Sequence, residues 1–136
     1  MTALVIDSSI AAAWCFSDER TDYTNGVLRA VSNSFEAFAP RLWAYEMRNS
    51  VLMGFRRKRI SRDDAQEFLD SLRDLPIRLS DPVSYDDVFA LAERHSLTVY
   101  DAAYVELALR EGLPLATLDR PMSSAALKAG VRPFEL

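Results

Sequence analysis

Short apolar runs alternate with longer helical stretches along the whole chain, and this alternation most narrows the folds that the chain can adopt. The first run, residues 3–6 (Ala-Leu-Val-Ile), is apolar at every position, which is typical of a strand buried on both faces. Further strands are expected at residues 35–39, 76–79 and 113–119, with a short one at 97–99. Strands separated by helices predict an α/β fold of three layers (α/β/α), with a central parallel sheet of four to five strands.

The helical stretches lie between these runs. They cover residues 10–16, 21–31, 42–57, 61–75, 84–95, 99–111 and 121–129. Ser8 or Ser9 is expected to cap the first helix, and Gly112 to end the sixth. Gly54 lies inside a helix, where glycine costs roughly 0.5–1 kcal/mol against alanine, so another segment is expected to approach closely there. There is no repeat or linker, so the sequence predicts one domain over residues 1–136.

Charge and composition limit the class of protein. The formal net charge of −4 argues against a nucleic-acid binder with a uniformly basic surface, but not against acids gathered in one site with bases around it. Cys15 is the only cysteine, which fits a reducing compartment. The apolar residues 3–16 have no preceding Lys or Arg and are interrupted by Asp7, so the pattern of a signal peptide is missing. No other run approaches membrane-spanning length, and we expect a cytoplasmic protein.

Asp101 occupies a position where an apolar residue is expected. On a helical wheel of residues 99–109, one side carries an apolar stripe made of Ala102, Tyr104, Val105, Leu107, Ala108 and Leu109. Asp101 falls in the middle of that stripe, while Glu106 and Arg110 point the other way. A carboxylate directed toward the interior or a cleft is costly unless something compensates its charge.

Three further acids are expected at the same edge of the sheet. Asp7 and Asp119 each follow an apolar run directly, and Asp101 follows residues 97–99 within two positions. Glu46 lies on the helix after the second strand, among apolar neighbours and near Asn49. Ligands of open parallel sheets bind at the carboxyl ends of the strands, so the four acids can form one site.

Each acid also has a structural interpretation. Asp7, Asp101 and Asp119 could each cap a helix, whereas Glu46, in the middle of a helix, caps nothing. It is less probable that four acids lie at one edge of the sheet for four separate structural reasons than that they form one acidic site. Two like charges 4 Å apart repel by roughly 4 kcal/mol at an effective dielectric of about 20, so such a site needs protons or a cation. Carboxylates without His or Cys suit Mg²⁺ or Mn²⁺ rather than Zn²⁺.

The sequence resembles the PIN-domain family, and more narrowly the VapC-type toxins of bacterial type II toxin–antitoxin systems. Four motifs in the family's order carry the resemblance: Val5-Ile6-Asp7-Ser8-Ser9, Pro40-Arg41-Leu42-Trp43-Ala44-Tyr45-Glu46-Met47-Arg48-Asn49, Tyr100-Asp101-Ala102-Ala103-Tyr104-Val105-Glu106-Leu107-Ala108 and Leu115-Ala116-Thr117-Leu118-Asp119.

The resemblance implies an endoribonuclease that depends on Mg²⁺ or Mn²⁺, is inhibited by a cognate antitoxin and forms a homodimer. The family's acidic quartet falls on Asp7, Glu46, Asp101 and Asp119, which would serve as catalytic and metal-binding residues. Asn49 and Thr117 stand where the family often has polar residues that support the acids.

Several features remain open to more than one interpretation. Arg120, next to Asp119, is a candidate for contact with an RNA phosphate. The basic run at residues 56–59 could do the same, although a basic helix C-terminus explains it better. A dehalogenase-like phosphatase needs a second acid where Ser9 stands. A receiver domain needs paired acids after the first strand and a lysine after a late strand, where this chain has Arg120 and Pro121. A catalytically silent PIN-like module that binds RNA or protein is the remaining alternative.

Overall fold

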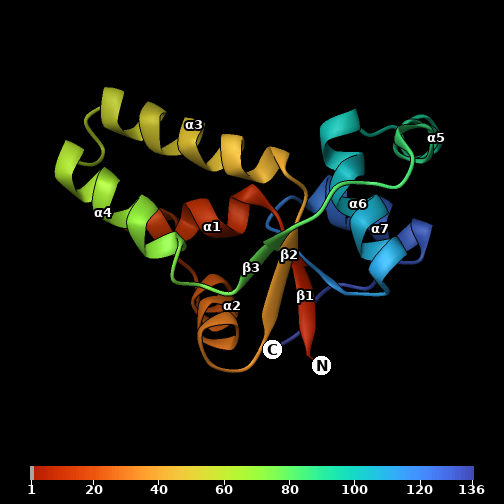
Figure 1. Ribbon diagram of the computed structural model, residues 1–136, viewed down its shortest axis with the longest axis horizontal. Coiled ribbons are helices and arrows are strands. Elements are labelled where there is room, and N and C mark those ends of the chain that lie inside the picture. The colour runs from red at the N-terminus through yellow and green to blue at the C-terminus, as the bar shows by residue number, and fades with distance from the viewer. Residues whose placement is uncertain (1) are drawn as a thin grey trace.

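The sheet of the computed structural model, which describes residues 2–136, contains four strands: β1 (Ala3–Ile6), β2 (Glu36–Ala39), β3 (Ile77–Leu79) and β4 (Leu115–Ala116). All neighbouring strands are parallel, in the order β3-β2-β1-β4 (Figure 1). Val5 of β1 pairs with Phe38 on one side and Leu115 on the other. The predicted parallel sheet of four to five strands is therefore confirmed, with four.

The helices fall within a few residues of their predicted positions. They are α1 (Ser8–Cys15), α2 (Asp22–Asn33), α3 (Leu42–Arg56), α4 (Arg62–Leu72), α5 (Tyr85–His95), α6 (Val99–Glu111) and α7 (Arg120–Ala129), with a short 3-10 turn, η1 (Ser17–Glu19), after α1. Gly112 ends α6 in the left-handed conformation (φ 66°), as predicted. Within residues 2–136, no helix combines the length and the apolar character needed to cross a membrane.

The helices form layers on the two faces of the sheet. In Figure 1, α1 to α4 (red to yellow-green) lie on one side, and α5 to α7 (teal to blue) lie on the other. Helix α6 packs against β1, β2 and β4, whereas α1 packs against α2 and α3. This arrangement is the predicted α/β/α fold.

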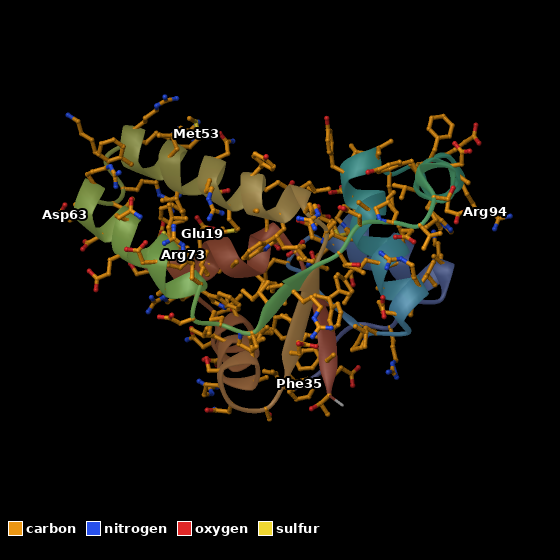
Figure 2. The ribbon with its side chains drawn as sticks, in the orientation of Figure 1. Glu19, Phe35, Met53, Asp63, Arg73 and Arg94 are labelled. Carbon is orange, nitrogen blue, oxygen red and sulfur yellow. The ribbon has the colours of Figure 1, made fainter. Side chains whose placement is uncertain are left out.

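The core is centred on β1, because this strand is covered on both faces. Leu4, Val5 and Ile6 have no exposed surface, and Tyr104 and Leu107 of α6 belong to the same cluster. Charged side chains such as Asp63 and Arg94 are exposed at the periphery (Figure 2). An apolar run without alternation, as in β1, is what burial on both faces requires.

The order of the strands creates a switch point between β1 and β4. The chain moves outward in one direction from β1 to β2 and β3, and then returns through α5 and α6 to place β4 on the other side of β1. At such a point the two connections leave in opposite directions and open a crevice at the carboxyl ends of the strands. The segments that carry Asp7 and Asp119 leave the sheet at this edge.

The predicted strand at residues 97–99 is wrong. Leu97 donates its backbone N–H to Ala92 at the end of α5, Ser96 is left-handed (φ 54°), and Thr98 caps α6. These residues form a tight turn between two helices that pack along each other. The run is too short to leave the turn and reach the sheet, and Leu97 packs instead against Val88 and Ala102 at the α5–α6 contact.

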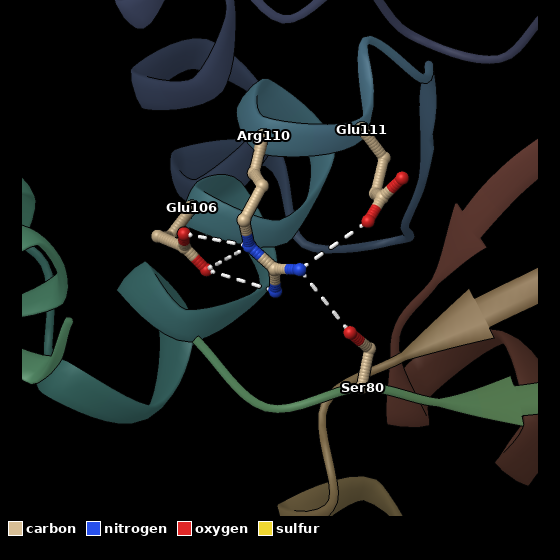
Figure 3. A network of polar contacts seen from close by, with 4 residues as sticks. All are labelled: Ser80, Glu106, Arg110 and Glu111. Carbon is tan, nitrogen blue, oxygen red and sulfur yellow. Dashed lines mark hydrogen bonds and ion pairs between the residues drawn. The ribbon is translucent and has the colours of Figure 1, made fainter. Parts of the chain in front are cut away.

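The expected outward direction of Glu106 is also wrong. Glu106 is 7% exposed, and its Oε2 accepts a hydrogen bond from Arg110 Nε at 3.0 Å (Figure 3). Arg110 Nη1 also donates to Ser80 Oγ at 3.2 Å and to Glu111 Oε1 at 3.3 Å (Figure 3). Ser80 directly follows β3, so this network ties the connection between β3 and α5 to α6.

Gly54 confirms the predicted close approach. A Cβ atom at this position would lie 2.4 Å from ring atoms of Phe16, at the end of α1. Arg59 lies over the same ring, with its guanidinium carbon 4.1 Å from the ring centroid. The glycine therefore lets α3 approach α1, and this contact fixes the helix that carries Glu46.

Candidate active site

Asp7 stands between β1 and α1. Its Oδ1 accepts the backbone N–H of Ile10 at 3.2 Å, so Asp7 is the N-cap of α1, and the predicted cap by Ser8 or Ser9 is wrong. Asp7 is only 3% exposed, and Ser9 donates its hydroxyl to the same Oδ1 at 2.6 Å. Burial raises the pKa of Asp7 above its ordinary value near 3.8, although these hydrogen bonds lower it in part.

Thr117 joins Asp7 to Asp119. Its hydroxyl donates to Asp7 Oδ2, and its Oγ1 accepts the backbone N–H of Asp119 at 2.9 Å. Asp119 Oδ1 accepts the backbone N–H of Met122 at 2.9 Å and so caps α7. The residue that follows β4 thus lies between two of the predicted acids and contacts both.

Glu46 lies on α3 and contacts α6. Its Oε1 accepts the phenol O–H of Tyr104, on α6, at 2.5 Å. Burial is the main cause that raises the pKa of Glu46, and the charges of Asp101 and Asp7 add to it. Burial, together with Glu46, raises the pKa of Tyr104 as well, so this phenol stays protonated and acts as the donor.

Asp101 lies in the first turn of α6. Its backbone N–H donates to Thr98 Oγ1 at 3.0 Å, so Thr98 is the N-cap and Asp101 is not. Burial raises the pKa of Asp101, and the charge of Asp119 raises it further. A side-chain hydrogen bond with Thr98 lowers the pKa of Asp101 in part.

Electrostatic repulsion connects the four acids. Asp119 raises the pKa of both Asp7 and Asp101, and both of these in turn raise that of Glu46. The fold therefore brings all four side chains within range of one another at the carboxyl edge of the sheet. Asp7 and Asp119 also cap helices, which means that a structural role and a place in the acidic group coexist in the same residues.

The chemistry of the donor set fits a hard divalent cation, although the side chains do not yet form its coordination shell. As they lie, no three His, Cys, Asp or Glu side chains among residues 2–136 are arranged to hold a metal ion. Asp7, Glu46 and Asp119 turn instead toward local donors, as expected for like charges that repel one another. Carboxylate oxygens without nitrogen or sulfur suit Mg²⁺ or Mn²⁺, and such an ion would relieve the repulsion between the carboxylates.

The other predicted site residues lie near the acids without contacting them. Asn49 is exposed one turn after Glu46 and lines a groove of about 230 Å³ between α1 and α3. Arg120 is exposed at the start of α7, and it forms no ion pair within the described chain. In the basic run, Arg59 binds Asp18 and Glu19 at 2.8 and 2.9 Å, which is a structural role.

A larger hollow lies away from the acids. It measures about 900 Å³ and lies between the end of α1 and the α3–α4 hairpin, with Trp14, Phe55 and Phe68 in its lining. None of the four acids lines it. The volume of a hollow therefore does not identify the candidate active site. The gathering of buried carboxylates identifies it.

Sequence reasoning missed three residues of the site. Ser9 donates to Asp7 and accepts the backbone N–H of Leu118 at 3.0 Å, and Tyr104 holds Glu46. Thr98 fixes the first turn of α6. The pattern Thr98-x-x-Asp101 could have revealed the cap. Nothing in the sequence distinguishes the Tyr104 hydroxyl from that of another core tyrosine.

These features, a parallel sheet with acids gathered at its switch point, define a class of protein, and comparison with known families identifies it. The chain belongs to the PIN-domain family: the model of the PIN domain matches residues 4–128. Within this family it is of the VapC type. It is 39% identical over 124 residues to ribonuclease VapC3 of Pyrobaculum aerophilum, across 88% of this chain and 92% of that protein. The predicted family is confirmed, in place of the phosphatase and receiver alternatives.

Solved structures share the fold. PAE2754 from Pyrobaculum aerophilum superimposes with a TM-score of 0.72 at 21% identity, over 91% of this chain and 84% of that one. A chain of VapBC2 from Rickettsia felis, solved bound to a DNA fragment from the promoter, gives a TM-score of 0.61 at 14% identity, over 87% and 89% of the two chains. At these identities the likeness concerns the fold.

Proposed function

We propose that this protein is an endoribonuclease that depends on Mg²⁺ or Mn²⁺ and acts as the toxin of a toxin–antitoxin pair. Asp7, Glu46, Asp101 and Asp119 hold the metal and form the catalytic site. The observation that carries the proposal is that four separate segments bring these carboxylates to one edge of the sheet, where Thr117 links Asp7 to Asp119 and Tyr104 holds Glu46. The 39% identity to a protein named as a ribonuclease supports RNA as the substrate.

The hydrogen bonds leave several carboxylate oxygens available as ligands. Tyr104 occupies Oε1 of Glu46, and the backbone N–H of Met122 occupies Oδ1 of Asp119, so the second oxygen of each carboxylate stays available. Asp7 is held at both oxygens and keeps the most fixed position. A divalent ion bound here would lower the pKa of a coordinated water and offset the charge that develops at phosphorus. The chain supplies the carboxylates, with Asp7 fixed by its hydrogen bonds and the other three carboxylates less restrained.

The supporting residues have distinct roles in this proposal. Thr117 fixes Asp7 and Asp119 relative to each other through its two hydrogen bonds. Arg120 is exposed beside Asp119, and it contacts a phosphate of the RNA strand. Asn49, one turn after Glu46 on α3, is the second supporting residue of the proposal, although it makes no hydrogen bond to Glu46 within residues 2–136.

The partners follow from the relatives. The Rickettsia felis structure is described as VapBC2 with promoter DNA, and it supports a cognate antitoxin as partner of the present chain. We extend the homodimer and the cytoplasmic location from the VapC-type resemblance. Light scattering of the purified chain tests the homodimer, and copurification of a tagged chain with a small DNA-binding protein from its own cells tests the antitoxin.

The decisive experiment maps RNA ends. Purified protein is incubated with total RNA in Mg²⁺, and the new ends are sequenced. Defined cleavage sites are expected for the wild type and for Asp63→Asn, an exposed control at the start of α4. No cleavage is expected with EDTA or for Asp7→Asn. Binding of RNA without cleavage in Mg²⁺ and Mn²⁺ would instead support the silent binding module, and cleavage by Asp7→Asn at the wild-type rate would refute the proposal.

A further inference from the structure

Tyr104 is a buried polar group that the proposed chemistry does not yet use. It is 1% exposed, it lies on the face of α6 that packs in the core, and its hydroxyl donates to Glu46 Oε1 at 2.5 Å. This is the contact that joins α6 to the carboxylate of α3. A core position needs only the ring, so the hydroxyl calls for a separate explanation.

Glu46 differs from its neighbours in how it is held. Backbone N–H groups fix Asp7 and Asp119, because both carboxylates cap helices. Glu46 lies inside α3, caps nothing, and has three rotatable side-chain bonds. Within residues 2–136, Tyr104 is the donor that restrains it.

Tyr104 also links Glu46 to the part of the site that carries Asp101. It lies three residues after Asp101, so both side chains project from neighbouring positions of the same helical face. Engagement of Oε1 leaves Oε2 of Glu46 without a donor from the described residues and therefore available to a cation.

We propose that Tyr104 is a positioning residue: its phenol holds Oε1 of Glu46 and thereby aims Oε2 at the metal site beside Asp101. This inference rests on the proposed metal-dependent function. Removal of a residue that orients a metal ligand through a hydrogen bond typically changes metal affinity or activity 10–100-fold. Tyr104 acts on the reaction through Glu46 and makes no contact with the metal itself.

The test is a titration of the purified full-length protein with Mn²⁺ by isothermal calorimetry. Tyr104→Phe keeps the ring and removes the hydroxyl, and we expect it to weaken Mn²⁺ binding about 10–100-fold. In RNA cleavage at saturating Mn²⁺, kcat is expected to fall with little change in KM, because the RNA contacts are intact. The matched control is Tyr23→Phe, which removes a hydroxyl that donates to the backbone oxygen of Phe134 at 2.7 Å, and it should bind Mn²⁺ like the wild type.

A double-mutant cycle separates positioning from a general loss of stability. Glu46→Gln alone should weaken Mn²⁺ binding, and Tyr104→Phe added to Glu46→Gln should weaken it no further, because the residue that Tyr104 positions has already lost its charge. Equal affinity of Tyr104→Phe and wild type, or multiplicative effects in the double variant, would overturn the inference and leave the proposed function intact. A wild-type protein that binds no Mn²⁺ would refute the proposed function, and the inference with it.

Discussion

Asp7→Asn should stabilise the metal-free protein although it destroys the proposed active site. Asparagine is as good an N-cap as aspartate, so the hydrogen bond from the Ile10 backbone N–H to the side chain at position 7 is retained. The substitution removes a charge that is 97% buried by exposed area and that Asp119 repels. A residue retained for function at the expense of stability behaves in this way.

The expected size follows from two opposing effects. Burial of one ion costs several kcal/mol even after relaxation, and Asn avoids this cost. The hydroxyl bonds from Ser9 and Thr117 lose their ionic partner, which weakens each by about 1 kcal/mol. We expect a net gain of about 1–2 kcal/mol near neutral pH, or about 3–6 °C in Tm for a chain of this length.

The sign of the pH dependence is an independent check. Because the pKa of Asp7 is raised in the native state, the native protein binds more protons than the unfolded chain above the ordinary value of about 3.8. Wild-type stability at this residue is therefore lost as the pH rises from about 4 through the raised pKa. The advantage of Asp7→Asn should be small at pH 4 and should grow to a plateau above that pKa.

Urea unfolding followed by circular dichroism in EDTA, at several pH values between 4 and 8, measures this difference. The control is Asp63→Asn on the exposed first turn of α4, which should destabilise by about 0.3–1 kcal/mol because it removes a charge that favours the helix dipole. The reasoning is refuted if Asp7→Asn is destabilised like the control, or if its advantage shrinks as the pH rises.

Three further predictions concern the frame of the site and its substrate. Arg110→Ala should cost about 3–5 kcal/mol in urea unfolding, because Glu106 is left buried and unpaired, and a loss under 1 kcal/mol would show that water replaces the arginine. Gly54→Ala should destabilise by about 1–3 kcal/mol through its clash with Phe16, despite the better helix propensity of alanine, and any gain in Tm would contradict the close contact of α1 and α3. Arg120→Ala should raise KM for RNA and reduce its salt dependence without changing Mn²⁺ affinity, whereas an unchanged KM across salt concentrations would remove this residue from the RNA-binding surface.

The sequence predicts the structure best where the burial of a segment and the order of residues along the chain determine the fold. A run such as residues 3–6 can only be a strand covered on both sides, and an acid directly after it must stand at the carboxyl edge. The positions of Asp7 and Asp119 follow from this argument alone. The position of Asp101 was correct for a different reason than expected, because the first turn of α6, and not a strand end, brings it to the edge.

The parts that could not be predicted depend on contacts between distant segments. The wheel of α6 placed Glu106 outside because it cannot show that the connection after β3 crosses that side and that Arg110 neutralises the charge. It also treated Tyr104 as an apolar residue, since only the tertiary fold brings α3 and Glu46 to its hydroxyl. The N-cap of α1 was assigned to Ser8 or Ser9 because Asp7, Ser8 and Ser9 are all good N-cap residues. The direction in which the chain leaves β1 selects Asp7 among them.

The most direct test of the account is a crystal structure of the wild-type protein soaked with Mn²⁺, with anomalous data collected at the manganese edge. The account predicts a strong anomalous peak at the switch point, with oxygens of Asp7, Glu46, Asp101 and Asp119 within about 2–2.5 Å of it or bridged to it by water. A soaked crystal with the four carboxylates as they lie now and no peak between them, from protein that cleaves RNA in the same Mn²⁺ buffer, would contradict it.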